Sequence, residues 1–201
     1  MARLMVVFTL LMGFLGFAGA ARADTPCAAL TSLSLPHAGV TSAVLTPAGA
    51  GKACKINVTA RPTADSDIRI EVWIPEGAAW NGRYLQSGTG GFAGSIRSEA
   101  LAALAAQGFA AAATDDGHQS ADFTDARWAA DHPDKATDYA YRALKETTDA
   151  AKALIAAYRG GPPKYSYFNG CSNGGREALM EAQKFPNDFD GIIAGAPATF
   201  G

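Results

Sequence analysis

One pentapeptide constrains the fold of this chain more than any other segment: Gly170-Cys171-Ser172-Asn173-Gly174, a G-x-S-x-G pattern. The residues before it, KYSYFNG, predict a strand, and those after it, GREALMEAQKFP, predict a helix. A turn that passes so sharply from strand to helix is strained, and glycines on both sides of the serine avoid backbone collisions. It holds the serine hydroxyl above the sheet, beside the positive end of the helix dipole. We therefore predict that Ser172 is a nucleophile on an α/β sheet.

The other segments alternate between strand and helix signals. Apolar patterns predict strands in INVTARP, DIRIEVWIP, RYLQS, FAAAAT and FDGIIAGAPA. Helices are predicted over residues 98–108, 138–159 and 175–186, and residues 119–136 are predicted to be a polar loop. The buried side of the long helix should consist of Leu144, Thr147, Ala151, Leu154, Ile155 and Tyr158, and that of the last helix of Ala178, Leu179, Ala182 and Phe185. This order predicts one mostly parallel sheet with helices on both faces.

Residues 1–23 predict a cleavable secretory signal. Arg3 precedes an apolar run from Leu4 to Ala18, and the small-residue pattern at 21–23 is typical of a cleavage site. The apolar run is shorter than a membrane-spanning helix requires. We therefore expect residues 24–201 to form the secreted or periplasmic protein, without membrane attachment. The full 201-residue chain has a formal net charge of −2, and its basic residues are scattered along the sequence. This pattern predicts no nucleic-acid partner.

The chain has three cysteines, and the expected export makes them candidates for disulfide bonds, because disulfides persist in oxidising compartments. Cys27 and Cys54 are a possible pair, although the sequence alone does not establish it. Cys171 is then left over directly before Ser172, and it needs a partner elsewhere.

A serine nucleophile needs a histidine base oriented by an acid, and on this kind of sheet both follow the serine in the chain. The 29 residues after Ser172 contain two aspartates, Asp188 and Asp190, and no histidine. The histidines that precede Ser172 are His37, His118 and His132. Either the usual order does not hold, or the sequence ends before its catalytic acid and base. We favour the second interpretation, because the predicted sheet also ends abruptly and Cys171 lacks a partner.

An oxyanion hole needs backbone N–H groups aimed at the oxygen that becomes negative. One donor is expected to be Asn173, and the other Gly91 or Gly90 in the glycine-rich segment SGTGGFAGS. A dinucleotide-binding turn is the competing interpretation, and it would make the protein an oxidoreductase that binds a nicotinamide cofactor. The glycines lack the G-x-G-x-x-G spacing that this requires. A plain flexible loop is the third alternative.

Two further sets of residues are candidates with weaker support. Asp115, Asp116 and His118 follow a predicted buried strand; a metal pair or a direct catalytic role is conceivable, but such residues more often stabilise a loop. The aromatic residues Trp80, Trp128 and Tyr139 are suited to stacking on an aromatic substrate, yet isolated aromatic residues usually belong to the core.

The segments GCSNGGREALMEAQKFPNDFDGIIAGAPA, WNGRYLQSGTGGFAG and ATDDGH resemble the tannase and feruloyl esterase family of α/β-hydrolases, which also contains the hydrolase acting on mono(2-hydroxyethyl) terephthalate. The resemblance extends from about Cys54 to Gly201. It implies the α/β-hydrolase fold, Ser172 as the nucleophile, an aromatic ester as small-molecule substrate and no organic cofactor. It also implies a disulfide from Cys171 to a cysteine directly before the catalytic histidine, and a lid domain, often calcium-binding, inserted after residues 191–197.

This sequence departs from the family pattern because it stops before the lid, the catalytic Asp and His, and the second cysteine. Calcium and ester preference are therefore expected only of the parent protein, and the 201-residue chain is expected to be an inactive, N-terminal part of the fold. A non-catalytic remnant or binding protein that retains the first half of the fold is the alternative.

Overall fold

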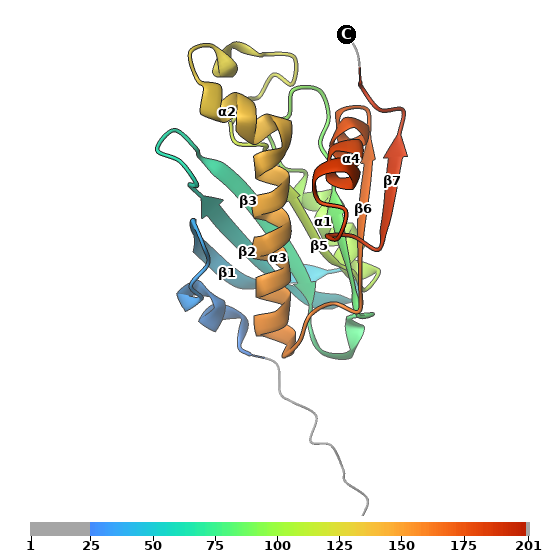
Figure 1. The fold of residues 1–201 in the computed structure, drawn as a ribbon. Coiled ribbons are helices and arrows are strands. Elements are labelled where there is room, and N and C mark those ends of the chain that lie inside the picture. The colour runs from blue at the N-terminus through green and yellow to red at the C-terminus, as the bar shows by residue number, and fades with distance from the viewer. Residues whose placement is uncertain (1–24, 200–201) are drawn as a thin grey trace, which may run out of the picture.

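The computed structural model describes residues 25–199, which form one sheet with helices against both faces (Figure 1). Within these residues the sheet has seven strands in the order β1-β2-β3-β5-β4-β6-β7. Their bounds are β1 Ala38–Ala48, β2 Gly51–Ala60, β3 Ile68–Pro75, β4 Arg83–Ser87, β5 Ala110–Thr114, β6 Tyr165–Cys171 and β7 Gly191–Gly195. The sheet is mixed: β1, β2, β3 and β5 pair antiparallel, and β5, β4, β6 and β7 pair parallel. The parallel half is the part that positions the site.

The helices divide between the two faces according to the alternation of side chains along β5. Helix α1 (Ser98–Ala106) packs with Ala111 and Ala113 on one face. Helix α3 (Ala143–Arg159) packs with Ala110 and Ala112 on the other face. Helix α4 (Asn173–Lys184) lies on the same face as α3, beside β6 and β7 (Figure 1). The predicted arrangement of helices on both faces is confirmed.

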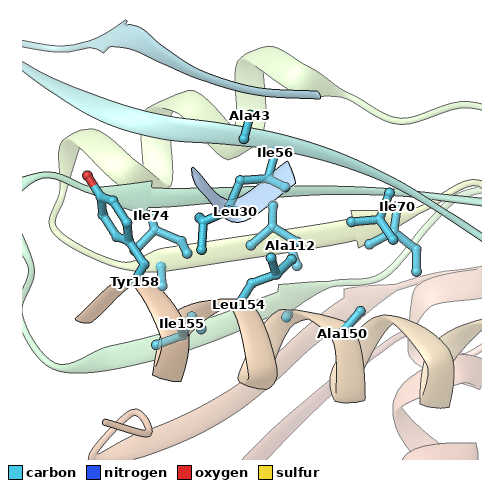
Figure 2. Packing of buried hydrophobic residues seen from close by; sticks show 14 of the residues in the cluster. Leu30, Ala43, Ile56, Ile70, Ile74, Ala112, Ala150, Leu154, Ile155 and Tyr158 are labelled. Carbon is cyan, nitrogen blue, oxygen red and sulfur yellow. The ribbon is translucent and has the colours of Figure 1, made fainter. Parts of the chain in front are cut away.

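The largest core cluster lies between α3 and the sheet, where Leu154 and Ile155 meet Ile56, Ile74 and other strand residues (Figure 2). Every residue predicted for the buried side of this helix is buried. Full burial of each Leu or Ile side chain contributes about 1.5–3 kcal/mol to stability. The apolar stripe of this helix is therefore a substantial part of the hydrophobic stabilisation of the core.

The segment before α3 differs from the prediction. Residues 119–136 were expected to be a loop throughout, but helix α2 (Pro133–Thr137) begins at Pro133, because proline at the first helical position leaves no hydrogen bond unmade. A π-helical turn, η4 (Asp138–Arg142), joins α2 to α3, so the helical path is longer than predicted. Short 3-10 turns occupy η1 (Cys27–Ser32), η2 (Gly77–Ala79) and η3 (Arg127–Ala129).

The prediction for the buried side of α4 is partly wrong. Ala178 is buried, but Leu179 and Ala182 are exposed, and the buried face instead carries Glu177 and Glu181. The start of the helix determines this rotation, because its first residues must face the sheet and the loop after β4. Positions three to four residues further along then share that face.

A disulfide joins Cys27 to Cys54, with 5.6 Å between their Cα atoms. It fixes the first helical turn, η1, to strand β2, next to the edge of the sheet, and this is the pairing that the sequence left open. The predicted signal at residues 1–23 lies outside the described residues. None of the helices within residues 25–199 has the length and apolarity needed to cross a bilayer.

Candidate active site at the turn between β6 and α4

Ser172 occupies the single residue between the end of β6 and the start of α4. Its φ is 61° and its ψ is −118°, a backbone conformation that residues other than glycine rarely adopt. Three backbone hydrogen bonds hold this strained residue in place: its N–H donates to the Gly195 carbonyl at 3.0 Å, and its carbonyl accepts from the N–H groups of Ala198 at 2.9 Å and Arg176 at 3.1 Å. The residue is exposed, as a nucleophile on such a turn must be.

Glycines around Ser172 are required because neighbouring backbone comes too close for a side chain. A Cβ on Gly170 would lie 2.1 Å from the Gly174 carbonyl oxygen, and one on Gly175 would lie 2.4 Å from the Gly195 carbonyl oxygen. A Cβ on Gly174 would lie 3.0 Å from the Thr89 carbonyl oxygen, so both glycines of the G-x-S-x-G pattern, Gly170 and Gly174, lie where a side chain would crowd neighbouring backbone.

The glycine-rich loop after β4 packs directly against the turn. A Cβ on Gly88 would lie 2.6 Å from the Gly174 Cα, and the Gly174 N–H donates to the Thr89 carbonyl at 2.9 Å. Gly91 has φ +59°, and a Cβ there would lie 2.4 Å from the Phe123 carbonyl oxygen. The contacts of Gly88 and Thr89 with Gly174 bring the loop that contains Gly90 and Gly91 to the Ser172 turn.

The predicted oxyanion donors thus come from two segments that the fold places side by side. Among residues 25–199, no group accepts a hydrogen bond from the N–H of Gly90 or Gly91. Both groups are therefore available to a ligand, and their role as donors together with Asn173 remains a prediction.

A buried polar network lies beneath the loop. The Glu177 carboxylate accepts from the Thr89 N–H at 3.0 Å and from the Asn173 side-chain amide at 2.7 Å, and the Thr89 hydroxyl also donates to it. Asp116 lies within 3.0 Å of the same hydroxyl. Burial and the adjacent Glu177 carboxylate raise the pKa of Asp116 well above its usual range.

Within the segment TDDGH, Asp115 stabilises its own loop, whereas Asp116 belongs to the network around Thr89. Asp115 accepts from the Arg69 N–H at 3.0 Å and from the Gly117 N–H at 2.9 Å, and burial raises its pKa to about 6. The His118 ring stacks on Trp128 with 3.8 Å between ring centroids, and burial lowers its pKa. In the described part of the chain no cluster of three or more His, Cys, Asp or Glu residues is placed to hold a metal ion.

Two of the three candidate aromatic residues lie near the site. Tyr139 packs against Trp128, with 5.3 Å between centroids, and its hydroxyl reaches the Gly91 carbonyl at 3.3 Å. Trp80 does not belong to this cluster, since its indole N–H donates to the Arg83 carbonyl at the amino end of β4.

Within residues 25–199, no side chain forms a hydrogen bond with the Ser172 hydroxyl. His132 instead contacts the Asp65 carboxylate at 2.9 Å. The aspartates after Ser172 have structural partners: Asp190 accepts from the Ser166 N–H at 2.7 Å, and Asp188 lies 3.4 Å from the Lys145 amine. Cys171 is exposed and forms no disulfide among the described residues.

The β6–α4 turn, the parallel strands around it and the glycine loop define the α/β-hydrolase fold with its nucleophile turn. The chain belongs to the tannase and feruloyl esterase family, whose sequence model matches residues 54–200.

Similar proteins agree with this assignment. An uncharacterised esterase of Xanthomonas campestris pv. campestris is 47% identical over 89% of this chain and 33% of its own length. A probable feruloyl esterase B-2 of Aspergillus flavus is 39% identical over 84% of this chain and 31% of its own length. The crystal structure of feruloyl esterase B from Aspergillus oryzae is similar with a TM-score of 0.78 and 30% identity, covering 86% of this chain and 36% of that chain. This chain therefore spans about a third of the length of these relatives.

Sequence reasoning missed the polar network of Thr89, Asn173 and Glu177 and the contact between Tyr139 and the loop. One local signal for the network was present: Glu177 is a charged residue one turn into the helix that begins directly after Ser172.

Proposed function

We propose that this chain carries the nucleophile of a secreted serine carboxylester hydrolase that acts on feruloyl, galloyl or related phenolic esters. The observation that carries the proposal is the exposed Ser172 at φ 61° between β6 and α4, with the glycine loop packed against its turn. The family assignment and the relatives named as feruloyl esterases support the substrate class.

In the proposed mechanism, the Ser172 oxygen attacks the ester carbonyl and a histidine accepts its proton. The N–H groups of Asn173 and of Gly91, with Gly90 as the alternative, stabilise the tetrahedral oxyanion. The intermediate expels the alcohol, which takes the proton from the histidine, and water then hydrolyses the acyl-serine to release the aromatic acid. We assign the histidine and its aspartate to parts of the protein outside residues 1–201, because none of the three histidines here contacts Ser172.

An aromatic acyl group suits the side chains near the glycine loop. Phe92 is 41% exposed and Phe123 is 65% exposed, and Phe123 contacts Gly91. Large aromatic side chains left in solvent beside a nucleophile offer faces on which a phenolic ring can stack.

Export is supported by the predicted signal at residues 1–23 and by the disulfide between Cys27 and Cys54. We further propose that Cys171 pairs with a cysteine outside this sequence, and that any calcium ion is structural and bound by the lid domain. The ester chemistry itself uses no cofactor.

The test begins with the protein as its source exports it. Its intact mass under non-reducing conditions shows whether it extends beyond residues 24–201, and a fluorophosphonate probe reports a reactive serine. We expect labelling at Ser172 and turnover of methyl ferulate or methyl gallate. Replacing Ser172 with alanine should lower kcat by at least about 10⁴-fold.

Ser32→Ala is the matched control, because Ser32 is exposed and its hydroxyl only caps a carbonyl within η1. Retention of turnover by Ser172→Ala would refute the proposed nucleophile. A mass equal to that of residues 24–201, without labelling or turnover, would favour the non-catalytic binding protein.

Residues 24–201 expressed alone are expected to be inactive and poorly folded. Ile193 on β7 is 65% exposed and Leu179 on α4 is 37% exposed, so apolar surface faces solvent at this edge of the described sheet. Measurable ester turnover by that purified segment would contradict this expectation.

A further inference from the structure

The two proposed oxyanion donors belong to segments that are 82 positions apart in the sequence, Gly91 after β4 and Asn173 at the start of α4. Both N–H groups must point at the same oxygen, and displacements of about 0.5 Å weaken such a site. The hydrogen bond from Gly174 to the Thr89 carbonyl fixes the beginning of the loop. A separate constraint is needed two residues further on, at Gly91.

Tyr139 provides that constraint. Its hydroxyl lies 2.8 Å from the Asn173 Oδ1 atom and 3.3 Å from the Gly91 carbonyl oxygen. Both neighbours are acceptors, so the hydroxyl proton is donated mainly to the closer Asn173 oxygen, with the Gly91 carbonyl as a second acceptor. The Tyr139 hydroxyl is therefore in contact with both residues whose N–H groups are proposed to bind the oxyanion.

The Asn173 side chain is fixed on all sides, so it can transmit this constraint. Its Oδ1 atom also accepts from the Arg176 Nε at 2.7 Å, and its amide nitrogen donates to Thr89 at 2.8 Å and to Glu177 at 2.7 Å. Asn173 is 2% exposed, and in such a buried environment each of these hydrogen bonds resists displacement.

The Tyr139 ring is itself held by α4. The Arg176 guanidinium lies over the ring, 4.5 Å from its centroid, and donates to the carbonyls of Tyr139 and Ala140 at 3.0 Å each. These carbonyls belong to the π-helical turn η4, a rare geometry that is frequent at functional sites. The π turn thus places the phenol over the junction between the glycine loop and the nucleophile turn.

We propose that Tyr139 is a positioning residue for ester hydrolysis: its hydroxyl joins the Gly91 turn to Asn173 and holds the two oxyanion-binding N–H groups in register. This inference rests on the proposed function of Ser172. Tyr139 acts through Gly91 and Asn173 and has no role in proton transfer.

Tyr139→Phe tests the proposal because it removes only the hydroxyl and keeps the ring beneath Arg176. The matched control is Tyr141→Phe, in the same π turn, because the Tyr141 ring packs against Phe185 and Lys184, away from the loop. Both variants are made in the complete exported protein, and rates are normalised to active serines titrated with a fluorophosphonate.

We expect Tyr139→Phe to lower kcat for methyl ferulate or methyl gallate about tenfold and to change KM less than about twofold. The lost hydrogen bond weakens stabilisation of the oxyanion, which forms in the transition state and is absent from the bound substrate, and one hydrogen bond corresponds to about this effect. Phenylboronic acid, which forms a tetrahedral adduct with a nucleophilic serine, should bind about tenfold more weakly, while ferulic acid binds as before. Tyr141→Phe should change none of these quantities.

Three outcomes separate the two proposals. A wild-type kcat in Tyr139→Phe, together with an inactive Ser172→Ala, would overturn the positioning role and leave the proposed function standing. Parallel weakening of phenylboronic acid and ferulic acid would show that Tyr139 only supports the local fold, which also overturns the positioning role. An active Ser172→Ala would reject the proposed function itself.

Discussion

Glu181 is predicted to make this fold less stable as the pH rises from about 5 to 8. Its side chain, on the buried face of α4, is 0% exposed, and among the described residues neither carboxyl oxygen has a hydrogen-bond partner. Burial, with a smaller contribution from Asp188, raises its pKa from 4.5 to about 8, while Lys145 and Lys152 lower it by less. At neutral pH the folded protein therefore keeps a proton on Glu181 that the unfolded chain releases.

The sign and size of the effect follow from this difference. Below pH 4.5 both states are protonated, and the ionisation contributes nothing to the free energy of unfolding. Between 4.5 and about 8 the unfolded state alone ionises, so that free energy falls by about 1.4 kcal/mol per pH unit. The loss reaches about 3 kcal/mol at pH 7 and about 5 kcal/mol above pH 8, where it becomes constant.

Glu181→Gln removes the ionisation and keeps the shape of the protonated acid. In urea unfolding followed by tryptophan fluorescence, we expect the free energy of unfolding of the variant to exceed that of the wild type by about 1 kcal/mol at pH 5 and by about 4 kcal/mol at pH 7.5. Glu76→Gln is the control: Glu76 is exposed, so its substitution should change the free energy of unfolding by less than about 0.5 kcal/mol at either pH. Parallel stability curves for wild type and Glu181→Gln would refute the reasoning.

Two further predictions concern the turn and the disulfide. Gly170→Ala places a Cβ 2.1 Å from the Gly174 carbonyl oxygen, so we expect at least about 3 kcal/mol of destabilisation and at least about a 100-fold loss of ester turnover. Gly161→Ala, which meets no atom within 4 Å, is its control, and equal behaviour of the two variants would contradict the steric argument. Replacing both Cys27 and Cys54 with serine opens a link across 27 residues and should lower the free energy of unfolding by about 3–4 kcal/mol in urea; an unchanged midpoint would oppose this.

Periodicity was sufficient to predict α3. Its apolar residues recur on one stripe, and that stripe packs against a surface of isoleucine and alanine side chains contributed by the strands. Because α3 contributes no residue to the candidate site, hydrophobic burial determines which side of the helix faces the sheet. All six predicted positions are accordingly buried.

Strand β1 was not predicted, and the reason lies in its position. It is the edge strand of the described sheet, and most of its side chains are exposed or half-buried, so its sequence carries little apolar alternation. Its pairing comes from backbone hydrogen bonds to β2 through the tight turn at Gly49, which has φ +60°. A local hydrophobic pattern predicts neither the backbone pairing nor the cross-strand register.

The strained turn at Ser172 and the glycines around it could be predicted because their steric requirement is local. The contacts of Thr89, Tyr139 and Glu177 could not, because they come from three segments that meet only after the sheet has formed. Their partners are single polar atoms, and no spacing along the chain reveals which atoms will meet.

The error in the buried face of α4 has a physical cause connected with the site. An amphipathic helix placed by burial alone would turn Leu179 inward, yet the structure leaves it 37% exposed and buries Glu177 and Glu181. Asn173 and Gly174 must face the glycine loop, and residues on the same side of the helix must follow them inward. At this position Glu177 accepts hydrogen bonds from Thr89 and Asn173, whereas Glu181, one turn later, is buried with no hydrogen-bond partner for its carboxylate within residues 25–199. A conflict between local pattern and structure is expected where a site imposes its own geometry, so the orientation of α4 itself supports the assignment of the site to this turn.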